Sequence, residues 1–460
     1  MTISSVAASV TVLKTGAVQP KQQSISPQME FSISLDTKKD TYRATGGVIF
    51  KWEGTHWQSQ EPMKLESEAL RFLFNVAPDR TNEKLAKSAV ATAALYLKEM
   101  PERLHSGGFP TPIIPTLNGS VEIDGGFTKL RDSRREDGLT YVINCKYEPL
   151  SPCPRFDAFL TEALPDADVR AFLQEYAGYT LLSDTRHEIA AWLIGEGGKG
   201  KGTFGVIMQS LHRQCVALSL DELDRFNLAK LPGASLVYVD ETPQGRIHEQ
   251  KLKSCISGDT INSDVKNRDA ITFAPTAKWI VNGNNLPVIS DYTSGFWRRW
   301  LIFPFHVKPA KKQPMLAETI IETELSGVLN WALVGLQRLL KRGEFPVLPM
   351  QMQKFADAVK TDSNSVLSWI EGQDVAISAT TNAESSVYRH YSKWCLENGM
   401  KSVNSTNFWK RLAVALPNLA HSKPRKGGKQ VRSINVSVSN LSDVDDHYGE
   451  MEYRRASGGY

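Results

Sequence analysis

The sequence predicts an α/β fold with a parallel sheet at its centre, a mainly helical N-terminal domain before it and a smaller helix-and-strand domain after it. Three observations predict the sheet. An apolar run over residues 189–194 is followed by a glycine-rich loop and then by a helical pattern from Thr203 to Leu211. Two further apolar runs, 235–239 and 279–281, have the unbroken character of strands buried on both faces. Strand, loop and helix in this order are typical of a parallel βαβ unit.

The composition is that of an ordinary globular protein. The chain has 460 residues, of which 41% are hydrophobic, and a net charge of +4, so we expect two to four domains. No run of about 18 apolar residues predicts a membrane span, and the N-terminus lacks the pattern of a secretory signal. Five scattered cysteines without a C-x-x-C spacing favour reduced thiols over disulfides or zinc; they are Cys145, Cys153, Cys215, Cys255 and Cys395.

Changes in composition divide the chain into five segments. Before the central domain we expect a hairpin over 47–57, a helix over about 82–100, strands over 120–123 and 141–145, and helices over 156–164 and 167–176. After it, residues 362–440 predict three helices followed by strands. The segments are a tail over 1–28, an N-terminal α+β or helical domain over 29–180, a central domain over 181–345, a C-terminal domain over 362–440 and a tail over 441–460.

The glycine-rich loop carries the strongest chemical signal. Gly195, Gly200 and Lys201 fit the phosphate-binding pattern G-x-x-x-x-G-K. Glycines let backbone N–H groups curve around a triphosphate, and the following helix N-terminus adds a partial positive charge. The Lys201 ammonium can reach the β- and γ-phosphates, so we expect ATP here, held by Gly195, Gly197, Gly198, Gly200, Lys201, Gly202 and Thr203.

One position of the loop departs from the pattern. Gly202 stands where a Ser or Thr normally binds Mg²⁺. Thr203 follows it, and we expect its hydroxyl to ligate the ion instead, together with Asp240 at the end of the strand over 235–239.

Polar residues follow the two later strands. Glu241 follows Asp240 directly and is the expected base that orients and deprotonates the attacking water. Lys201 and Asp240 are 240 − 201 = 39 positions apart, and the pair is far more specific than either part. Asn284, after the strand over 279–281, can both donate to and accept from a γ-phosphate or water.

Basic residues accompany these motifs. Arg298 and Arg299 precede an apolar strand, and a guanidinium suits a phosphoryl group during transfer. Residues 260–273 predict a hairpin with Lys266 and Arg268 at its tip, and Lys253 lies upstream. Taken alone, a Lys-Asn-Arg turn is usually a solvated turn and an Arg pair is often only a surface feature.

Assembled, the motifs resemble those of superfamily 3 helicases, which are ring-forming AAA+ ATPases of viruses and plasmids. Within them the chain is most similar to the helicase half of phage and plasmid primase–helicases. The features that carry the resemblance are the loop ending Gly-Lys-Gly-Thr-Phe, the acidic Val-Tyr-Val-Asp-Glu, the segment from Leu252 to Arg268, Asn284-Asn285-Leu286-Pro287 and the Arg pair before a strand ending Pro-Phe.

The resemblance implies an AAA+-like core and a ring, which we expect to contain six subunits with ATP between them. One arginine would reach the neighbour's ATP, Arg299 being the first choice and Arg298 the second. It also implies 3′-to-5′ movement on single-stranded DNA, gripped in the channel by Lys266 or Arg268, with Lys253 as a further DNA contact. The chain shows no paired Asp cluster followed by a His, so we expect a helicase without primer synthesis.

The C-terminal domain predicts a winged helix. Two helices over 387–394 and 404–416 precede a basic loop and a strand over 433–438. Such a domain can bind duplex DNA, and a protein-docking domain with a solvated charge run is the alternative. The basic residues of the expected wing are Lys423, Arg425, Lys426 and Lys429.

The sequence therefore predicts an ATP- and Mg²⁺-dependent DNA helicase that unwinds DNA during replication of a phage, plasmid or satellite element. We expect it in the cytoplasm of a bacterial host, acting on single-stranded and forked DNA with a separate primase or replication initiator. The rival is an origin-binding initiator whose ATPase controls assembly and not unwinding. A P-loop kinase-like enzyme acting on a small molecule is disfavoured, because it needs neither the Arg pair nor the basic hairpin.

Overall fold

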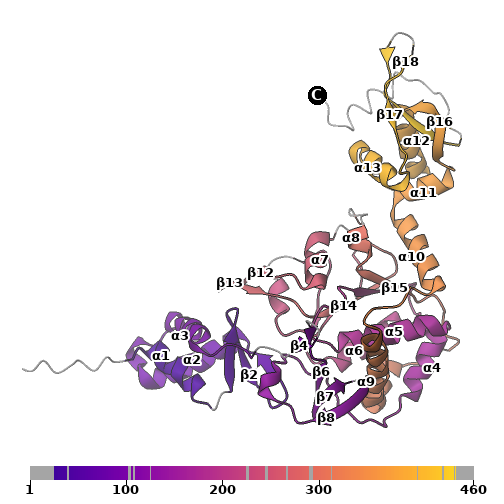
Figure 1. Ribbon diagram of the computed structural model, residues 1–460. Coiled ribbons are helices and arrows are strands. Elements are labelled where there is room, and N and C mark those ends of the chain that lie inside the picture. The colour runs from indigo at the N-terminus through magenta and orange to yellow at the C-terminus, as the bar shows by residue number, and fades with distance from the viewer. Residues whose placement is uncertain are drawn as a thin grey trace, which may run out of the picture. The chain divides into compact units, whose positions relative to one another are not determined.

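The computed structural model (Figure 1) divides the chain into two compact units, Met1–Arg43 with Gln60–Lys98 and Ala44–Ser59 with Glu99–Tyr460. The predicted boundary at residue 180 falls inside the second unit. The structure describes residues 25–38, 41–101, 105–106, 109–124, 126–223, 227–243, 247–265, 268–287, 289, 294–311, 313–400, 402–426, 429–439 and 441.

In the described part of the first unit, three α-helices pack on one another. Ser26 accepts from the Met29 N–H to cap the first helix, and Asn82 accepts from the Leu85 N–H to cap the third. Leu65, Ala69 and Leu73, at helical spacing, form the buried face of the second. The helices are α1 (Pro27–Asp36), α2 (Pro62–Val76) and α3 (Glu83–Tyr96); α1 takes in the last two residues of the predicted N-terminal tail.

A five-stranded parallel sheet forms the centre of the second unit and confirms the predicted α/β class. Every residue of its three inner strands and of the edge strand over residues 300–304 is buried, because helices cover both faces of the sheet and leave no solvated side. The strand order is β10 (Cys215–Ala217), β11 (Leu236–Val239), β14 (Lys278–Gly283), β9 (Ala190–Ile194) and β15 (Trp300–Pro304), and each adjacent pair is parallel.

Successive strand residues enter two different cores. Leu193, Ile280 and Phe303 pack in the core shared with the helices α4, α5, α6 and α9, which lie together in Figure 1. Trp192, Val281 and Ile302 pack in the other core with α7. The helices are α4 (Pro154–Ala163), α5 (Ala167–Thr180), α6 (Lys201–Leu211), α7 (Glu249–Ser257), α8 (Ser294–Trp297) and α9 (Leu316–Arg342).

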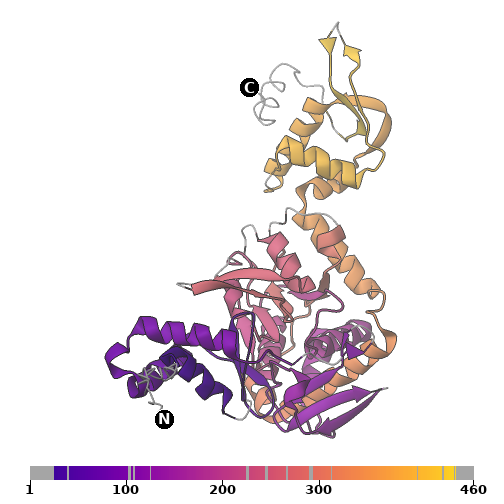
Figure 2. The same ribbon diagram turned by 60° about the vertical axis from the view of Figure 1, so that its left-hand side comes forward.

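Antiparallel strands occur in addition to this sheet. The expected hairpins near residue 50 and over 260–273 are both present, and β12 and β13 of the second extend away from the parallel sheet (Figure 2). The expected strand over 141–145 is wrong, since only one bridge, between Ile143 and His212, forms there. The strands are β1 (Tyr42–Thr45), β2 (Val48–Trp52), β3 (Trp57–Ser59), β4 (His105–Ser106), β5 (Phe109–Pro110), β6 (Ile113–Thr116), β7 (Gly119–Asp124), β8 (Phe127–Arg131), β12 (Ile261–Val265) and β13 (Arg268–Phe273).

The C-terminal part has its own core, around Trp369, Tyr391 and Phe408. Its sheet has the order β16-β20-β17, and β18 pairs with β19. The sequence analysis missed β16, because its mostly exposed Ala, Ser and Thr residues show no apolar alternation. The elements are α10 (Met350–Ser363), α11 (Ser365–Gly372), β16 (Ala376–Ala383), α12 (Glu384–Glu397), α13 (Ser405–Ala415), β17 (His421–Ser422), β18 (Arg425–Lys426), β19 (Lys429–Gln430) and β20 (Ser433–Ser437).

The cysteines, possible metal ligands and long helices can be seen in the described residues. All five cysteines are free thiols, and no cluster of three or more His, Cys, Asp or Glu residues that could hold a metal occurs in the described part of the chain. None of the helices described is both long and apolar enough to cross a membrane.

Three histidines with lowered pKa values make the second unit sensitive to acid. Burial lowers the pKa of His212 to about 3 and those of His56 and His187 to about 4, whereas an unfolded His has a pKa of about 6.5. As the pH falls, the unfolded chain therefore takes up protons before the folded chain does. The stability that these neutral histidines contribute is present above about pH 6.5 and is lost as the pH falls towards 4.

We predict that the thermal midpoint falls between pH 7 and pH 5, and that His212→Gln reduces this pH dependence because it removes the most strongly shifted group. Thermal unfolding of both proteins over this range checks it. An unchanged dependence in the variant would show that His212 is not linked to stability.

Candidate functional site

The polar residues predicted for the site meet at one edge of the parallel sheet. The glycine loop follows β9, Asp240 and Glu241 follow β11, and Asn284 follows β14. Because the strands are parallel, their carboxyl ends share one edge. β14 lies between β11 and β9, so Asn284 is placed between the acidic pair and the loop.

The loop has the backbone shape of an anion cradle. Gly198 and Gly200 have φ values of +76° and +95°, which are left-handed conformations that favour glycine. A Cβ on Gly200 would also lie 2.9 Å from Phe159 Cε2 of α4. α6 begins directly after Gly200, at Lys201 and not at the expected Thr203, and no side chain caps it. Its first N–H groups are therefore available to a phosphate.

Lys201 is buried and held at the mouth of this loop. Its ammonium donates to the Gly195 carbonyl, to the Glu196 carbonyl at 2.9 Å and to Asn284 Oδ1 at 3.3 Å. Burial, and then the charge of Lys199, lower the pKa of Lys201. The structure thus brings Lys201 and Asn284 together as the sequence predicts.

Asp240 and Glu241 are exposed at the end of β11. The Tyr238 hydroxyl donates to Asp240 Oδ1 at 3.2 Å and accepts a hydrogen bond from the Asn282 amide. Burial, and then the Asp240 charge, raise the pKa of Tyr238, so the phenol keeps the proton that it donates.

A second hydroxyl fixes the turn after Glu241. Thr242 Oγ1 donates to the Asn282 carbonyl at 2.8 Å and accepts from Trp192 Nε1 at 3.2 Å. Sequence reasoning missed Tyr238, Asn282 and Thr242 as positioning residues. The available signal for Tyr238 and Asn282 was a polar group inside each of the apolar runs Leu236–Val239 and Lys278–Gly283; Thr242 lies outside both runs and had no such signal.

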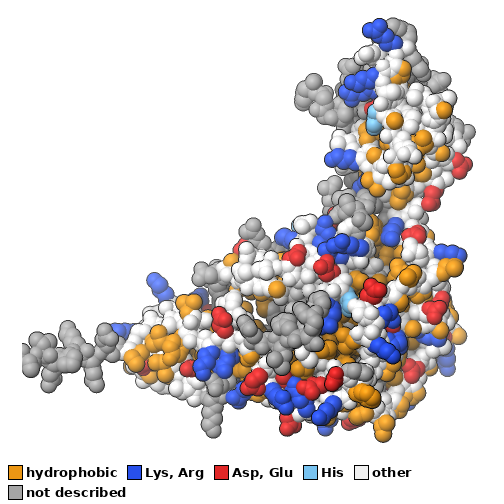
Figure 3. All heavy atoms as spheres, in the orientation of Figure 1, with side chains coloured by type: hydrophobic (Ala, Val, Ile, Leu, Met, Phe, Trp, Pro, Cys, Tyr) orange, Lys and Arg blue, Asp and Glu red, His pale blue; other side chains and the backbone are white. Residues whose placement is uncertain are grey.

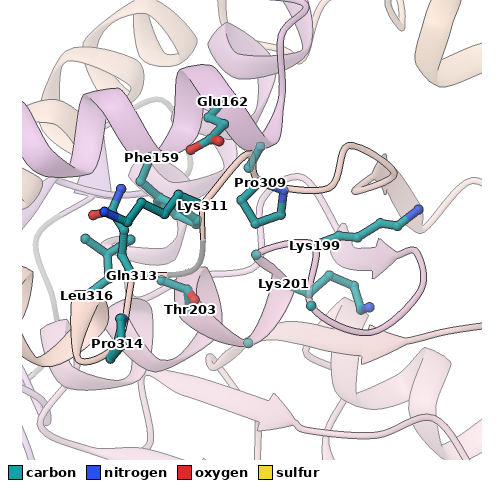
Figure 4. Close-up of a pocket in the computed structure, with 14 residues that line it drawn as sticks. Phe159, Glu162, Lys199, Lys201, Thr203, Pro309, Lys311, Gln313, Pro314 and Leu316 are labelled. Carbon is teal, nitrogen blue, oxygen red and sulfur yellow. The ribbon is translucent and has the colours of Figure 1, made fainter.

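A pocket of about 430 Å³ lies between the glycine loop and α4 (Figure 4). Apolar groups from α4 and from the segment after β15 form much of its wall. Figure 4 shows the Lys201 and Thr203 side chains pointing to opposite sides, because residues two apart on a helix are rotated by about 200°. The lining residues are Phe159, Glu162, Ala163, Gly198, Lys199, Gly200, Lys201, Gly202, Thr203, Pro309, Lys311, Gln313, Pro314 and Leu316.

The two arginines lie at the opposite edge of the sheet. They precede Trp300, which pairs with Ala190 at the start of β9, whereas the glycine loop follows the end of β9. Arg299 is nearly buried and donates to the Gly295 carbonyl, to Ser257 Oγ and, at 3.1 Å, to Glu188 Oε2. The Arg298 side chain is 66% exposed. The preference for Arg299 as the residue that reaches outward therefore conflicts with its bonding inside its own chain.

The basic residues expected to contact DNA are only partly described. Lys253 is half-buried in α7. Lys266 lies outside the described residues, as do the side chains of Arg268, Lys426 and Lys429. Lys423 and Arg425 are exposed, and Figure 3 shows basic side chains at the end of the C-terminal part where β18 lies. The expected basic loop includes a short hairpin, β18 with β19.

Three protein families match successive parts of the chain. Residues 34–165 match the family described as D5 N terminal like, residues 193–299 match a family of unknown function (DUF5906), and residues 352–450 match the family described as Poxvirus D5 protein-like.

The individual proteins that are similar to this chain share 24% of its residues or fewer over the matched parts. A candidate helicase of Acanthamoeba polyphaga mimivirus, L207/L206, is 24% identical over 226 residues, which are 46% of this chain and 22% of that protein. The chain thus spans about a fifth of that relative's length. Two apo structures of the NrS-1 C-terminal region are similar, one with 13% identity, 88% coverage of this chain, 99% of that chain and a TM-score of 0.46, the other with 12%, 90%, 100% and 0.48.

The different surroundings of the two arginines predict different stabilities. Arg299→Ala removes the nearly buried cation that pairs with Glu188 and donates to Ser257, and should lower the free energy of unfolding by about 2–3 kcal/mol. Arg298→Ala removes an exposed group and should change it by less than about 0.5 kcal/mol. Denaturant unfolding of the two variants checks this. Equal effects would contradict the difference in burial.

Proposed function

We propose that the chain is an ATP-driven DNA helicase of replication of the phage-type primase–helicase family, with an AAA+-like core that assembles as a ring of six; the matches of residues 34–165 and 352–450 to the two D5 families support this proposal. The observation that carries the proposal is the division of the sheet into two chemically different edges. Lys201, Asp240, Glu241 and Asn284 share one edge, and the exposed Arg298 lies at the other. The 3′-to-5′ direction rests on the family resemblance.

ATP fits the glycine loop and the pocket beside it. The loop and the N-terminus of α6 would hold the phosphates, and Lys201 would exchange its carbonyl partners for phosphate oxygens. Phe159, Pro314 and Leu316 offer apolar surface in the adjoining pocket, which suits the adenosine. The pocket volume of about 430 Å³ lies in the range of small-molecule sites.

Mg²⁺ fits Asp240 better than Thr203. Asp240 is an exposed carboxylate on the phosphate side, oriented by Tyr238, and Mg²⁺ commonly uses one or two carboxylates, phosphate oxygens and water. Thr203 points away from Lys201, so we now assign the ion to Asp240 with water. The bound ion would neutralise charge on the phosphates.

Glu241 and Asn284 would organise the hydrolytic water. Glu241 is exposed beside Asp240 and is the base of the proposal. Asn284 already contacts the Lys201 ammonium through its oxygen, and its amide N–H groups are donors suited to a phosphate or to water.

Arg298 suits action on a neighbouring subunit. β9 and β15 have five residues each, so the two edges of the sheet are about 16 Å apart. Arg298 is therefore poorly placed for the ATP of its own chain, and in the proposed ring it would act on the ATP of a neighbouring copy. The bonding of Arg299 makes Arg298 the better candidate. A trans-acting arginine typically contributes about 10³ to 10⁵ in rate.

DNA contacts come from two places. The β12–β13 hairpin carries Lys266 and Arg268, which we assign to phosphates of the single strand in the ring channel. The order α11, β16, α12, α13, β17, hairpin, β20 supports a winged helix at the C-terminus. We assign Lys423, Arg425, Lys426 and Lys429 of its wing to duplex DNA.

A strand-displacement assay separates the helicase from its rival, the origin-binding initiator. We predict that wild type unwinds forked DNA with Mg²⁺ and ATP. Lys201→Ala abolishes both hydrolysis and unwinding, because the cation for the β- and γ-phosphates is lost. Glu241→Gln retains ATP binding but loses at least about 10² in turnover.

Each outcome has a clear interpretation. Hydrolysis without unwinding by wild type would favour the initiator. Normal turnover by Glu241→Gln would remove Glu241 from the role of base. ATP binding by Glu241→Gln, followed with a fluorescent nucleotide, is the control for folding.

Residue 202 tests the magnesium assignment. A Cβ on Gly202 meets no atom within 4 Å, so Gly202→Ser can add the missing hydroxyl without a clash. We predict that Gly202→Ser lowers the Mg²⁺ concentration for half-maximal hydrolysis by about threefold or more. Thr203→Ala should leave that concentration within about twofold of wild type. A large rise with Thr203→Ala would restore Thr203 as a ligand.

A further inference from the structure

A cluster of three polar side chains joins separate segments at the amino edge of the sheet. Glu188 precedes β9, Ser257 ends α7 and Arg299 precedes β15. Ser257 Oγ donates to Glu188 Oε2 at 3.2 Å and accepts from Arg299 Nε at 2.9 Å and Nη2 at 2.8 Å. Arg299 Nη2 also lies 3.1 Å from Glu188 Oε2. Each of the three side chains therefore contacts the other two.

The backbone around Glu188 is held in a specific shape. Glu188 has a φ of +50°, a left-handed conformation that is unfavourable for a non-glycine residue unless its surroundings hold it. Its N–H donates to the Thr185 carbonyl at 2.8 Å, and Thr185 Oγ1 donates to the Ser257 carbonyl at 2.9 Å. Gly258 follows with a φ of +76°, and a Cβ there would lie 2.4 Å from Thr185 Oγ1. The 185–188 turn is thus fixed to the end of α7.

The cluster lies between the hairpin and the exposed arginine. Three residues after Gly258, β12 begins the basic hairpin at Ile261. Next to Arg299 is Arg298, whose guanidinium lies 3.9 Å from the same Glu188 oxygen. The Glu188 carboxylate therefore contacts Ser257, which lies close to the base of the hairpin, and also lies beside the exposed Arg298 guanidinium.

We propose that Glu188 is a positioning residue that transmits the loading of the hairpin by a nucleic-acid strand to Arg298. The inference rests on the proposed function, since it assumes ATP hydrolysis between subunits. When the hairpin base is displaced, Ser257 moves with it. This movement changes how closely the Glu188 carboxylate pairs with Arg299 and with Arg298. A neighbour's phosphate competes with Glu188 for Arg298, so the hold of this carboxylate sets how readily the arginine engages.

The test compares ATP hydrolysis with and without a single-stranded oligothymidylate. Ser257→Ala removes the hydroxyl that joins Glu188 to the hairpin base, and Glu188→Gln removes the charge. Ser257→Ala should keep the DNA-free rate within about twofold of wild type, whereas Glu188→Gln weakens the hold on Arg298 and should raise the DNA-free rate. Both variants should lose most of the stimulation by DNA. Ser257→Thr keeps the hydroxyl and should keep the stimulation. Ser254→Ala, one turn earlier on α7, is the matched control and should behave as wild type.

The readout separates coupling from mere support of the fold. If Ser257→Ala and Glu188→Gln change the DNA-free and DNA-stimulated rates by the same factor, the cluster only stabilises the edge and the proposal is overturned. Hydrolysis by wild type that DNA does not stimulate overturns this inference alone. Wild type that hydrolyses no ATP overturns the proposed function as well, so the two failures are distinct.

Discussion

The parallel pairing of β9 with β14 on one side and β15 on the other is the constraint on which both functional edges depend. It places the glycine loop and Asn284 together, because β9 and β14 end at the same edge. It also places Glu188 beside Arg299, because the residues before β9 and β15 meet at the other edge. The pairing is stable because every residue of these strands is buried between two helical layers. Chemistry at either edge therefore relies on the same core.

Hydrogen bonds within the chain organise the edge of the sheet that carries the glycine loop. Burying an ammonium is costly unless hydrogen bonds compensate, and Lys201 obtains them from two loop carbonyls and Asn284. A phosphate in the loop offers the same cation stronger, charged acceptors. The Asn282–Tyr238–Asp240 chain similarly fixes a carboxylate without neutralising it. Little reorganisation is then needed, which is the property that electrostatic catalysis requires.

Local patterns predicted the parts of this site that neighbouring residues determine. The strands β9, β11, β14 and β15 were predictable because they are unbroken apolar runs, and the loop because Gly200 and Lys201 are adjacent to each other. The direction of Thr203 depends on where α6 begins, and that start lies two residues earlier than the periodicity suggested. Glu188 and Arg299 are 111 positions apart and Ser257 and Arg299 are 42 apart, so their contact follows from strand order, which no local pattern specifies.

The two-edged arrangement has a consequence for how hydrolysis can be controlled. In a site whose groups all lie at one edge, a single chain could complete the chemistry alone. Under the proposed function, the arginine that acts on the phosphate in transfer is Arg298, which is exposed at the edge where α7 ends before the hairpin, and Glu188 contacts both Ser257 of α7 and Arg298. Under the proposed function, a subunit that contacts DNA would therefore act on the ATP of its neighbour before its own. Hydrolysis would then follow the order in which subunits meet the strand, because the mechanical contact and the catalytic arginine share one carboxylate.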